Sequence, residues 1–514
     1  MPKIDVLVLG AGHNGLFAST LLARAGLAVT VLEERPVVGG ACVTEYPFKS
    51  APKLGCSTGA YLLGLMPPEL IQKLNLDLPL IRRDPHYFLP TTGERYLLFG
   101  TDHEELRRQF IEFFSESDWL ANQAMNVELA QIRDDLAPAW LLPPLSLDET
   151  AERFIRKPLR RAFVDLCRGS ARNFLERFGF RSDLLKAMYA TTDAFSGLHG
   201  GYDTPGTGMN LLVHNMCRLP DADGTWMVVR GGMGTVTQQL AARATEAGVR
   251  IKTDAKVSSI QTRGGAFKSV TLSSGESISA CALVCNADPF RVMGLLPREA
   301  VPIDLRSRLD RMRTDGSTLK VNLCLERLPR FRCLPEGRQA LGATIHLLPE
   351  EGTVLDDLAR AYQQSSRGLL PDFPTIEWYI HTAADPSLRD AEGRHSSALF
   401  VQWVPYALKD GSWEGQEQLY VQHLLSICDR FAPGTTELVR ETFVLTPPKI
   451  ESYFGITRGH IHHVDNKIGF ADRVPYRSSI QGLYFCGAGC HPAGSVIGAA
   501  GHNAAQIVQE DLAC

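Results

Sequence analysis

The stretch IDVLVLGAGHNG (4–15) opens with a mostly apolar run that predicts a buried strand and continues directly into a glycine-rich loop. The residues that follow, His13–Ala25, have the pattern of a helix. Gly10 permits a sharp turn, Gly12 lets a pyrophosphate approach the backbone N–H groups at the helix start, and Gly15 lets the helix pack closely on the strand. The stretch therefore predicts a dinucleotide-binding loop.

An acidic residue and paired glycines follow this loop at the expected distance. Glu33 ends the next predicted strand, 18 residues after Gly15, where a carboxylate accepts hydrogen bonds from an adenosine ribose. Arg35 comes next and leads to Gly39 and Gly40. Because flexible backbone at this place lies along the pyrophosphate and ribitol of FAD, the pattern favours FAD over NAD.

The C-terminal segment Leu483–Gly501 predicts a strand, a glycine-rich turn and the start of a final helix, which is expected near Ala499–Leu512. Backbone N–H groups near Gly494, Ser495 and Val496 are predicted to lie at that helix start and to meet the pyrimidine ring of a flavin, where negative charge collects on reduction. No second GxGxxG has the same strand, helix and acid around it, so a separate NAD(P)H domain is not predicted.

Three separated segments, 1–90, 221–290 and 446–514, carry the patterns of one nucleotide-binding domain. The first insert, 91–220, is rich in helical patterns and predicts a helical cap on the substrate side. The second insert, 291–445, alternates strand-like runs with proline-containing loops and predicts a substrate-binding sheet domain. The sequence leaves the oligomeric state open.

Composition excludes several classes of protein. The 514 residues include 53 basic and 57 acidic side chains, and a net charge of -4 argues against a nucleic-acid partner. The 12 cysteines form no CxxC pair, so neither a disulfide scaffold nor a redox dithiol is predicted. The first strand begins too early to leave room for a signal peptide, and a cytoplasmic location is expected.

The GAGHNG loop, the E-x-R-x-x-x-GG tail and the ending YFCGAGCHPAGSVIGAAG resemble the phytoene-desaturase-like flavoproteins, which are FAD-dependent oxidoreductases. The resemblance implies an α/β fold: a Rossmann-like FAD-binding domain of the glutathione-reductase type, with α+β inserts that supply a mixed or antiparallel substrate sheet and a helical cap. It also implies that FAD is bound non-covalently. The matching cofactor positions are Gly10, Gly12, Gly15, Glu33, Arg35, Gly39, Gly40, Gly487, Gly494 and Val496, with Val257 on the strand that holds the adenine.

One position departs from the carotenoid desaturases, which usually carry threonine where this chain has Cys490. A covalent bond between this cysteine and the flavin is the less favoured alternative.

Two residues are candidates for catalysis. Lys320, on the predicted strand Leu319–Leu325, resembles the lysine near flavin N5 in amine-oxidase-type flavoproteins; an ordinary solvent-facing lysine is the alternative. His491, in the glycine-rich turn, is a candidate acid/base or flavin contact, with a structural role in the turn equally favoured. His460 and His462 would share a face of a strand, but no carboxylate or cysteine is expected beside them, so no metal site is predicted.

The resemblance favours desaturation or dehydrogenation of a small hydrophobic substrate, polyene or lipid-like, by hydride transfer to flavin N5. Redox-neutral isomerisation or saturation, amine oxidation, and a flavin-retaining interaction protein stay as alternatives. Such a substrate also favours peripheral contact with a membrane through apolar segments such as 140–145 and 159–163, although a helical cap with a buried apolar face explains them equally.

Overall fold

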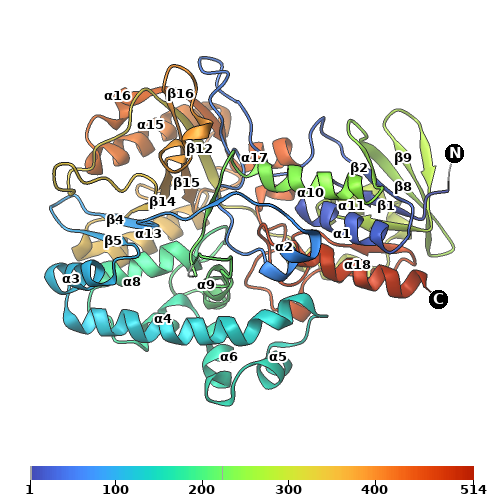
Figure 1. Cartoon of the computed structure of the whole chain (residues 1–514), viewed down its shortest axis with the longest axis horizontal. Coiled ribbons are helices and arrows are strands. Elements are labelled where there is room, and N and C mark those ends of the chain that lie inside the picture. Colours follow the sequence, from blue (N-terminus) through green and yellow to red (C-terminus); the bar gives the residue numbers. More distant parts are fainter. Residues whose placement is uncertain (1–2, 223, 514) are drawn as a thin grey trace.

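The computed structural model describes residues 3–222 and 224–513 and divides into a nucleotide-binding domain, a large sheet and a helical layer (Figure 1). The nucleotide-binding domain is built on a parallel sheet whose strands come from all three predicted segments, which confirms the α/β fold class. In spatial order these strands are β17 (Leu483–Phe485), β11 (Ala282–Cys285), β1 (Val6–Leu9), β2 (Val29–Leu32) and β7 (Arg250–Lys252).

Three helices from distant parts of the chain pack together beside this sheet. Helix α1 contacts both α10 and α18, so the N- and C-terminal segments lie side by side at one end of the molecule (Figure 1). The bounds are α1 (His13–Arg24), α10 (Gly234–Glu246) and α18 (Ala499–Leu512).

Two runs that the sequence predicts as single strands are each divided between the parallel sheet and a small antiparallel sheet. The apolar patterns of Val249–Ile260 and Val270–Val284 predict two long strands, but turns break each of them. The first run passes from the parallel sheet to the small antiparallel sheet and the second run passes back, and a strand cannot pair in two sheets without bending. The small sheet contains β8 (Val257–Arg263), β9 (Ala266–Leu272) and β10 (Ser277–Ser279).

The second large sheet has seven strands and is mixed, since β4 pairs in parallel with β13 while the other pairs are antiparallel. Helix α15 (Trp413–Phe431) packs on one face, where alternate residues of β12 join the core. In order, the strands are β16 (Val439–Leu445), β12 (Leu319–Leu325), β15 (His395–Gln402), β14 (Thr375–Tyr379), β13 (Thr344–Leu347), β4 (Tyr87–Pro90) and β5 (Tyr96–Phe99). The range 1–90 thus includes β4, a strand of the substrate-side sheet.

The helical layer follows β5 and lies below the seven-stranded sheet in the view of Figure 1. In the two apolar segments considered for membrane contact, Trp140 and Phe163 are buried, whereas Pro143 and Arg161 are exposed, so contact with a membrane stays a prediction. The layer contains α3 (His103–Phe113), α4 (Glu116–Leu136), α5 (Leu147–Phe154), α6 (Arg160–Arg168), α7 (Ala171–Glu176), α8 (Asp183–Tyr189), the π-helical turn Ala190–Ala194 and α9 (Thr207–His214).

Shorter elements connect these layers. Within the described ranges, no helix has the length and apolar character needed to cross a membrane. The connecting elements are α2 (Pro68–Leu74), β3 (Leu80–Ile81), β6 (Val228–Val229), α11 (Pro289–Leu295), α12 (Ile303–Met312), α13 (Val354–Ser366), α14 (His381–Ala384), α16 (Thr435–Leu438) and α17 (Pro447–Phe454).

Candidate functional site

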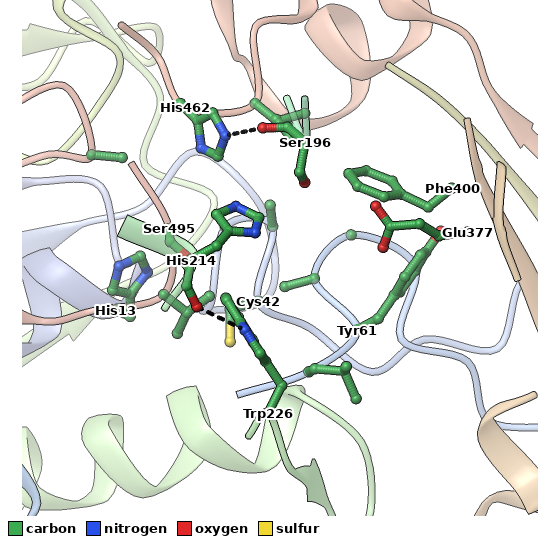
Figure 2. Close-up of a pocket in the computed structure, with 18 of the residues that line it drawn as sticks. His13, Cys42, Tyr61, Ser196, His214, Trp226, Glu377, Phe400, His462 and Ser495 are labelled. Carbon is green, nitrogen blue, oxygen red and sulfur yellow. Dashed lines mark hydrogen bonds between the residues drawn. The ribbon is translucent and has the colours of Figure 1, made fainter. Parts of the chain in front are cut away.

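A cavity of about 1250 Å³ runs from the carboxyl ends of the parallel strands to the face of the seven-stranded sheet that α15 does not cover. Pockets for a single small ligand usually measure about 300–1000 Å³, so this volume fits a cofactor and a substrate together. Figure 2 shows His13 and Ser495 on one side of the cavity and Tyr61, Glu377 and Phe400 on the other. We call the first side the cofactor side and the second side the substrate chamber.

The glycine-rich loop lies at the cofactor side. Gly10 and Gly12 line the cavity, and a Cβ on Gly12 would lie 2.7 Å from Asn286 Nδ2. Gly15 does not line the cavity; a side chain there would clash with the carbonyl oxygen of Gly10, which agrees with its predicted role in close packing. Helix α1 begins at His13 without a side-chain cap, so its first N–H groups are left for a ligand.

The carboxylate of Glu33 is held at the end of β2. It is buried and lines the cavity, and its two oxygens accept from the backbone N–H groups of Ala11, at 2.7 Å, and Arg35, at 2.9 Å. These bonds keep an acceptor beside the glycine-rich loop, where an adenosine ribose is expected.

Arg35 is hydrogen-bonded to the backbone of the paired glycines. Its guanidinium donates to Gly40 O at 3.0 Å and to Glu45 at 2.6 Å. Gly39 has φ +124°, a left-handed conformation that favours glycine, and a Cβ there would lie 2.7 Å from Cys42 O. Arg35, Gly39 and Gly40 all line the cavity.

The adenine end predicted from the resemblance is also part of the cavity. Val257, the first residue of β8, lines it together with its neighbours Ala255 and Lys256. Glu34 lines the same region and pairs with both Lys256, at 2.9 Å, and Arg291, at 3.0 Å.

The C-terminal turn approaches the cavity, and the final helix starts at Ala499, as the sequence predicts. The expectation that Gly494–Val496 supply the N–H groups of the helix N-terminus is wrong. Helix α18 begins at Ala499, after Gly498 in the left-handed conformation, so Gly494–Val496 form a turn and not a helix N-terminus. Ser495 and Val496 line the cavity, whereas Gly494 lies behind them, with its N–H donating to Asn466 Oδ1 at 2.9 Å. Gly487 also lies outside the lining.

Buried polar atoms on the cofactor side lack partners within the protein. Burial lowers the pKa of His13 to about 4, and its Nε2 has no hydrogen-bond partner among the described residues; the same holds for Asn14 Oδ1. Both side chains line the cavity. Since buried polar atoms are normally satisfied, these atoms, the uncapped helix and the crowded Gly12 fit a bound flavin dinucleotide.

Lys320 lies in the substrate chamber, so the alternative of a solvent-facing lysine is wrong. It is 6% exposed, and its Nζ lies 4.1 Å from the ring centroids of both Tyr61 and Phe400. Burial lowers its pKa to about 7, even though the charge of Glu377 opposes the shift. A lysine with this pKa exchanges a proton near neutral pH.

Several chamber residues were not found from the sequence. Glu377, on β14, accepts from the hydroxyl of Tyr379 and lies 3.6 Å from His346 Nε2. Asp193, on the π-helical turn, receives a hydrogen bond from Asn215 at 3.1 Å, and burial raises its pKa to about 7. Glu377 and Asp193 lie far apart in the sequence, within apolar strand and helix patterns, and only the fold brings them together. The one sequence signal that could have identified them is an acidic residue inside an apolar run.

His491 and Cys490 do not line the cavity. His491 Nε2 lies 3.1 Å from Ala139 O, and its ring packs edge-on against Phe470, so the geometry favours the structural role in the turn. The Cys490 thiol is buried, and burial raises its pKa to about 12.

The histidines near residue 460 form a loop rather than the strand considered above. His462 and His463 line the cavity, and His462 Nε2 lies 3.1 Å from Ser196 O (Figure 2). A carboxylate does lie nearby, since His460 Nε2 is 3.8 Å from Asp465. Within the described part of the chain, no group of three His, Cys, Asp or Glu residues is arranged to hold a metal ion.

Comparisons with known proteins agree with this geometry. Residues 15–370 match the family described as flavin containing amine oxidoreductase. The chain is 34% identical to mouse pyridine nucleotide-disulfide oxidoreductase domain-containing protein 2, over 99% of this chain and 94% of that protein. It is 24% identical to phytoene desaturase from Neurospora crassa, over 98% of this chain and 85% of that protein. These matches confirm the resemblance found in the motifs.

A solved structure shows the same fold. An oxidoreductase from Methanosarcina mazei superposes with a TM-score of 0.61 at 15% identity, covering 99% of this chain and 100% of that chain.

Proposed function

This chain belongs to the family of flavin-containing amine oxidoreductases and is an FAD-dependent oxidoreductase, and from that premise we propose that it dehydrogenates a largely hydrophobic, lipid-like substrate by hydride transfer to flavin N5. The proposal is supported by one observation, a continuous cavity that joins the glycine-rich loop to a chamber lined by Lys320. The N. crassa relative is a desaturase, which favours removal of hydrogen from carbon over the alternatives.

The chain itself supplies a proton acceptor. A bound flavin supplies the hydride acceptor. When hydride leaves one carbon, a proton leaves its neighbour, and the neutral amine of Lys320 takes that proton as the double bond forms. Tyr61 and Phe400 then stabilise the new ammonium through their ring faces, each 4.1 Å from Nζ.

Aromatic side chains between the sheet and the helical layer support a hydrophobic substrate. They come from β4, β5, α4 and α8, and from the loop before β6, so both layers contribute to the chamber wall. Such a wall excludes water and binds an apolar chain. The residues are Tyr87, Phe99, Trp119, Tyr189 and Trp226.

Non-covalent binding of FAD is part of the proposal. Cys490 is 1% exposed and lies outside the cavity lining. Cys42 does line the cavity, but its Sγ lies 3.2 Å from Met233 O, and burial raises its pKa to about 12, which keeps it as the unreactive thiol. Acid precipitation should release all of the flavin into the supernatant; flavin retained in the pellet would contradict this part.

The test is anaerobic reduction of the purified flavoprotein, followed by its visible spectrum, across matched polyenes, lipids and amines. Bleaching by a polyene or lipid is the expected result. Bleaching by amines alone would overturn the substrate class, and conversion of a polyene without net bleaching would indicate isomerisation. Retained flavin that no substrate in the panel reduces would favour an interaction protein.

A further inference from the structure

The substrate chamber contains a buried cation without a counter-charge. Arg83, in the loop between β3 and β4, is 6% exposed and lines the cavity. Its Nε and Nη2 donate to Trp226 O at 3.3 and 3.0 Å, and its Nη1 donates to Thr344 Oγ1 at 2.7 Å. Both acceptors are neutral, and no carboxylate of the described residues forms an ion pair with this guanidinium. Burying an unpaired charge is costly, which points to a ligand that pairs with it.

A second buried arginine shows what a purely structural role looks like in this protein. Arg473 is 1% exposed and lies outside the cavity lining. It donates to four backbone carbonyls, those of Cys490, Asp465, Val464 and Ala488. A guanidinium has five N–H donors, so the protein engages four at Arg473 but three at Arg83. Two donors of Arg83 thus remain for a molecule in the cavity.

The acids of the chamber are already engaged elsewhere. Glu377 is held by Tyr379 and lies near His346, and Asp193 is held by Asn215. Neither forms an ion pair with Arg83. Arg133, which also lines the cavity, pairs with Asp134 at 3.2 Å, whereas Arg83 has no such partner among the described residues.

We propose that Arg83 binds the carboxylate of the substrate, which makes the substrate an acid with an apolar chain. The two remaining N–H donors suit a carboxylate oxygen pair, and the aromatic wall suits the chain. The inference rests on the proposed function for one point only, that the chamber receives the substrate.

The test measures binding without turnover, using decanoate and methyl decanoate as probes of the flavin-loaded protein. Equilibrium dialysis and perturbation of the flavin spectrum should show decanoate bound at least roughly 10-fold more tightly than its ester, because the ester lacks the charge. Equal binding of the two probes by the wild-type protein overturns the inference, whatever the variants do.

Binding of the two probes to arginine variants tests whether Arg83 forms the anion site. Arg83→Gln should weaken decanoate binding roughly 10- to 100-fold and leave methyl decanoate unchanged, whereas Arg83→Lys should recover part of the loss. Arg218→Gln, which removes a half-buried arginine outside the cavity lining that pairs with Glu69 at 2.6 Å, is the matched control and should change neither probe. Undiminished decanoate binding in Arg83→Gln overturns the inference.

The outcomes separate this inference from the proposed function. Decanoate binding that depends on Arg83, in a protein whose flavin no substrate reduces, supports the anion site and contradicts the dehydrogenase. Flavin reduction by neutral lipids with no preference for acids supports the dehydrogenase and overturns the anion site.

Discussion

Replacing Lys320 by methionine should remove the rise of substrate oxidation with pH. Methionine keeps the length and apolar stem of lysine between Tyr61 and Phe400 but cannot take a proton. The wild-type amine must be neutral to act as a base, so activity increases as pH rises through its pKa.

The structure sets the size of this effect. Burial lowers the pKa of Lys320 from 10.5 to about 7. The neutral share of the amine is then about one tenth at about pH 6 and about nine tenths at about pH 8, so kcat/KM should rise about 10-fold and then level off. An exposed lysine would instead produce a rise of about 100-fold over the same interval with no plateau.

The assay is anaerobic stopped-flow bleaching of the flavin by a substrate found in the reduction panel, measured from about pH 6 to about pH 9. Lys268→Met, at an exposed position on β9, is the matched control and should keep the wild-type profile. Asp193 also has a pKa of about 7. A profile that survives in Lys320→Met but disappears in Asp193→Asn would refute the assignment of Lys320 as the base.

Three further outcomes are expected. Gly12→Val should lose bound flavin, because its side chain meets Asn286, while Gly415→Ala, with open space around it, keeps the flavin; absorbance per protein checks this. Relative to Lys320→Met, the wild-type free energy of unfolding should rise between about pH 7 and about pH 10, by up to about 1.4 kcal/mol per pH unit. The reason is that the unfolded lysine still holds the proton that folded Lys320 has released. Denaturant titrations at several pH values measure the difference. Phe88→Ala, which removes a fully buried ring packed 5.0 Å from Phe331, should cost about 3–5 kcal/mol in the same titrations, and a loss below about 1 kcal/mol would contradict the packing.

The cofactor side could be predicted because its determinants are local. The strand, the GAGHNG loop and helix α1 are continuous in the chain, and the demands on Gly10, Gly15 and Gly39 arise largely from positive φ angles or from backbone a few residues away. The start of α18 at Ala499 was predicted, but Gly494–Val496 were wrongly assigned to its N-terminus. Their turn is held by Asn466 through a hydrogen bond that the local pattern does not contain.

The substrate chamber could not be assembled in this way. The sequence suggested Lys320, but its burial follows from β12 pairing with β15, which places Phe400 opposite it. Glu377 reaches the chamber because β14 pairs with the other side of β15. These pairings join residues tens of positions apart, and side-chain periodicity alone does not specify which strands meet.

By itself, the sequence determined that this protein has a Rossmann-like FAD-binding fold, because the loop that binds a dinucleotide is a short, continuous run whose glycines are required by sterics. Only the tertiary structure decided that Lys320 is buried, that His491 serves the turn, and that Arg83 faces the chamber without a counter-charge. The reason is physical: burial and charge pairing depend on which distant segments pack together, and desolvation by those segments moves the pKa of Lys320 into the range where it can act as a base.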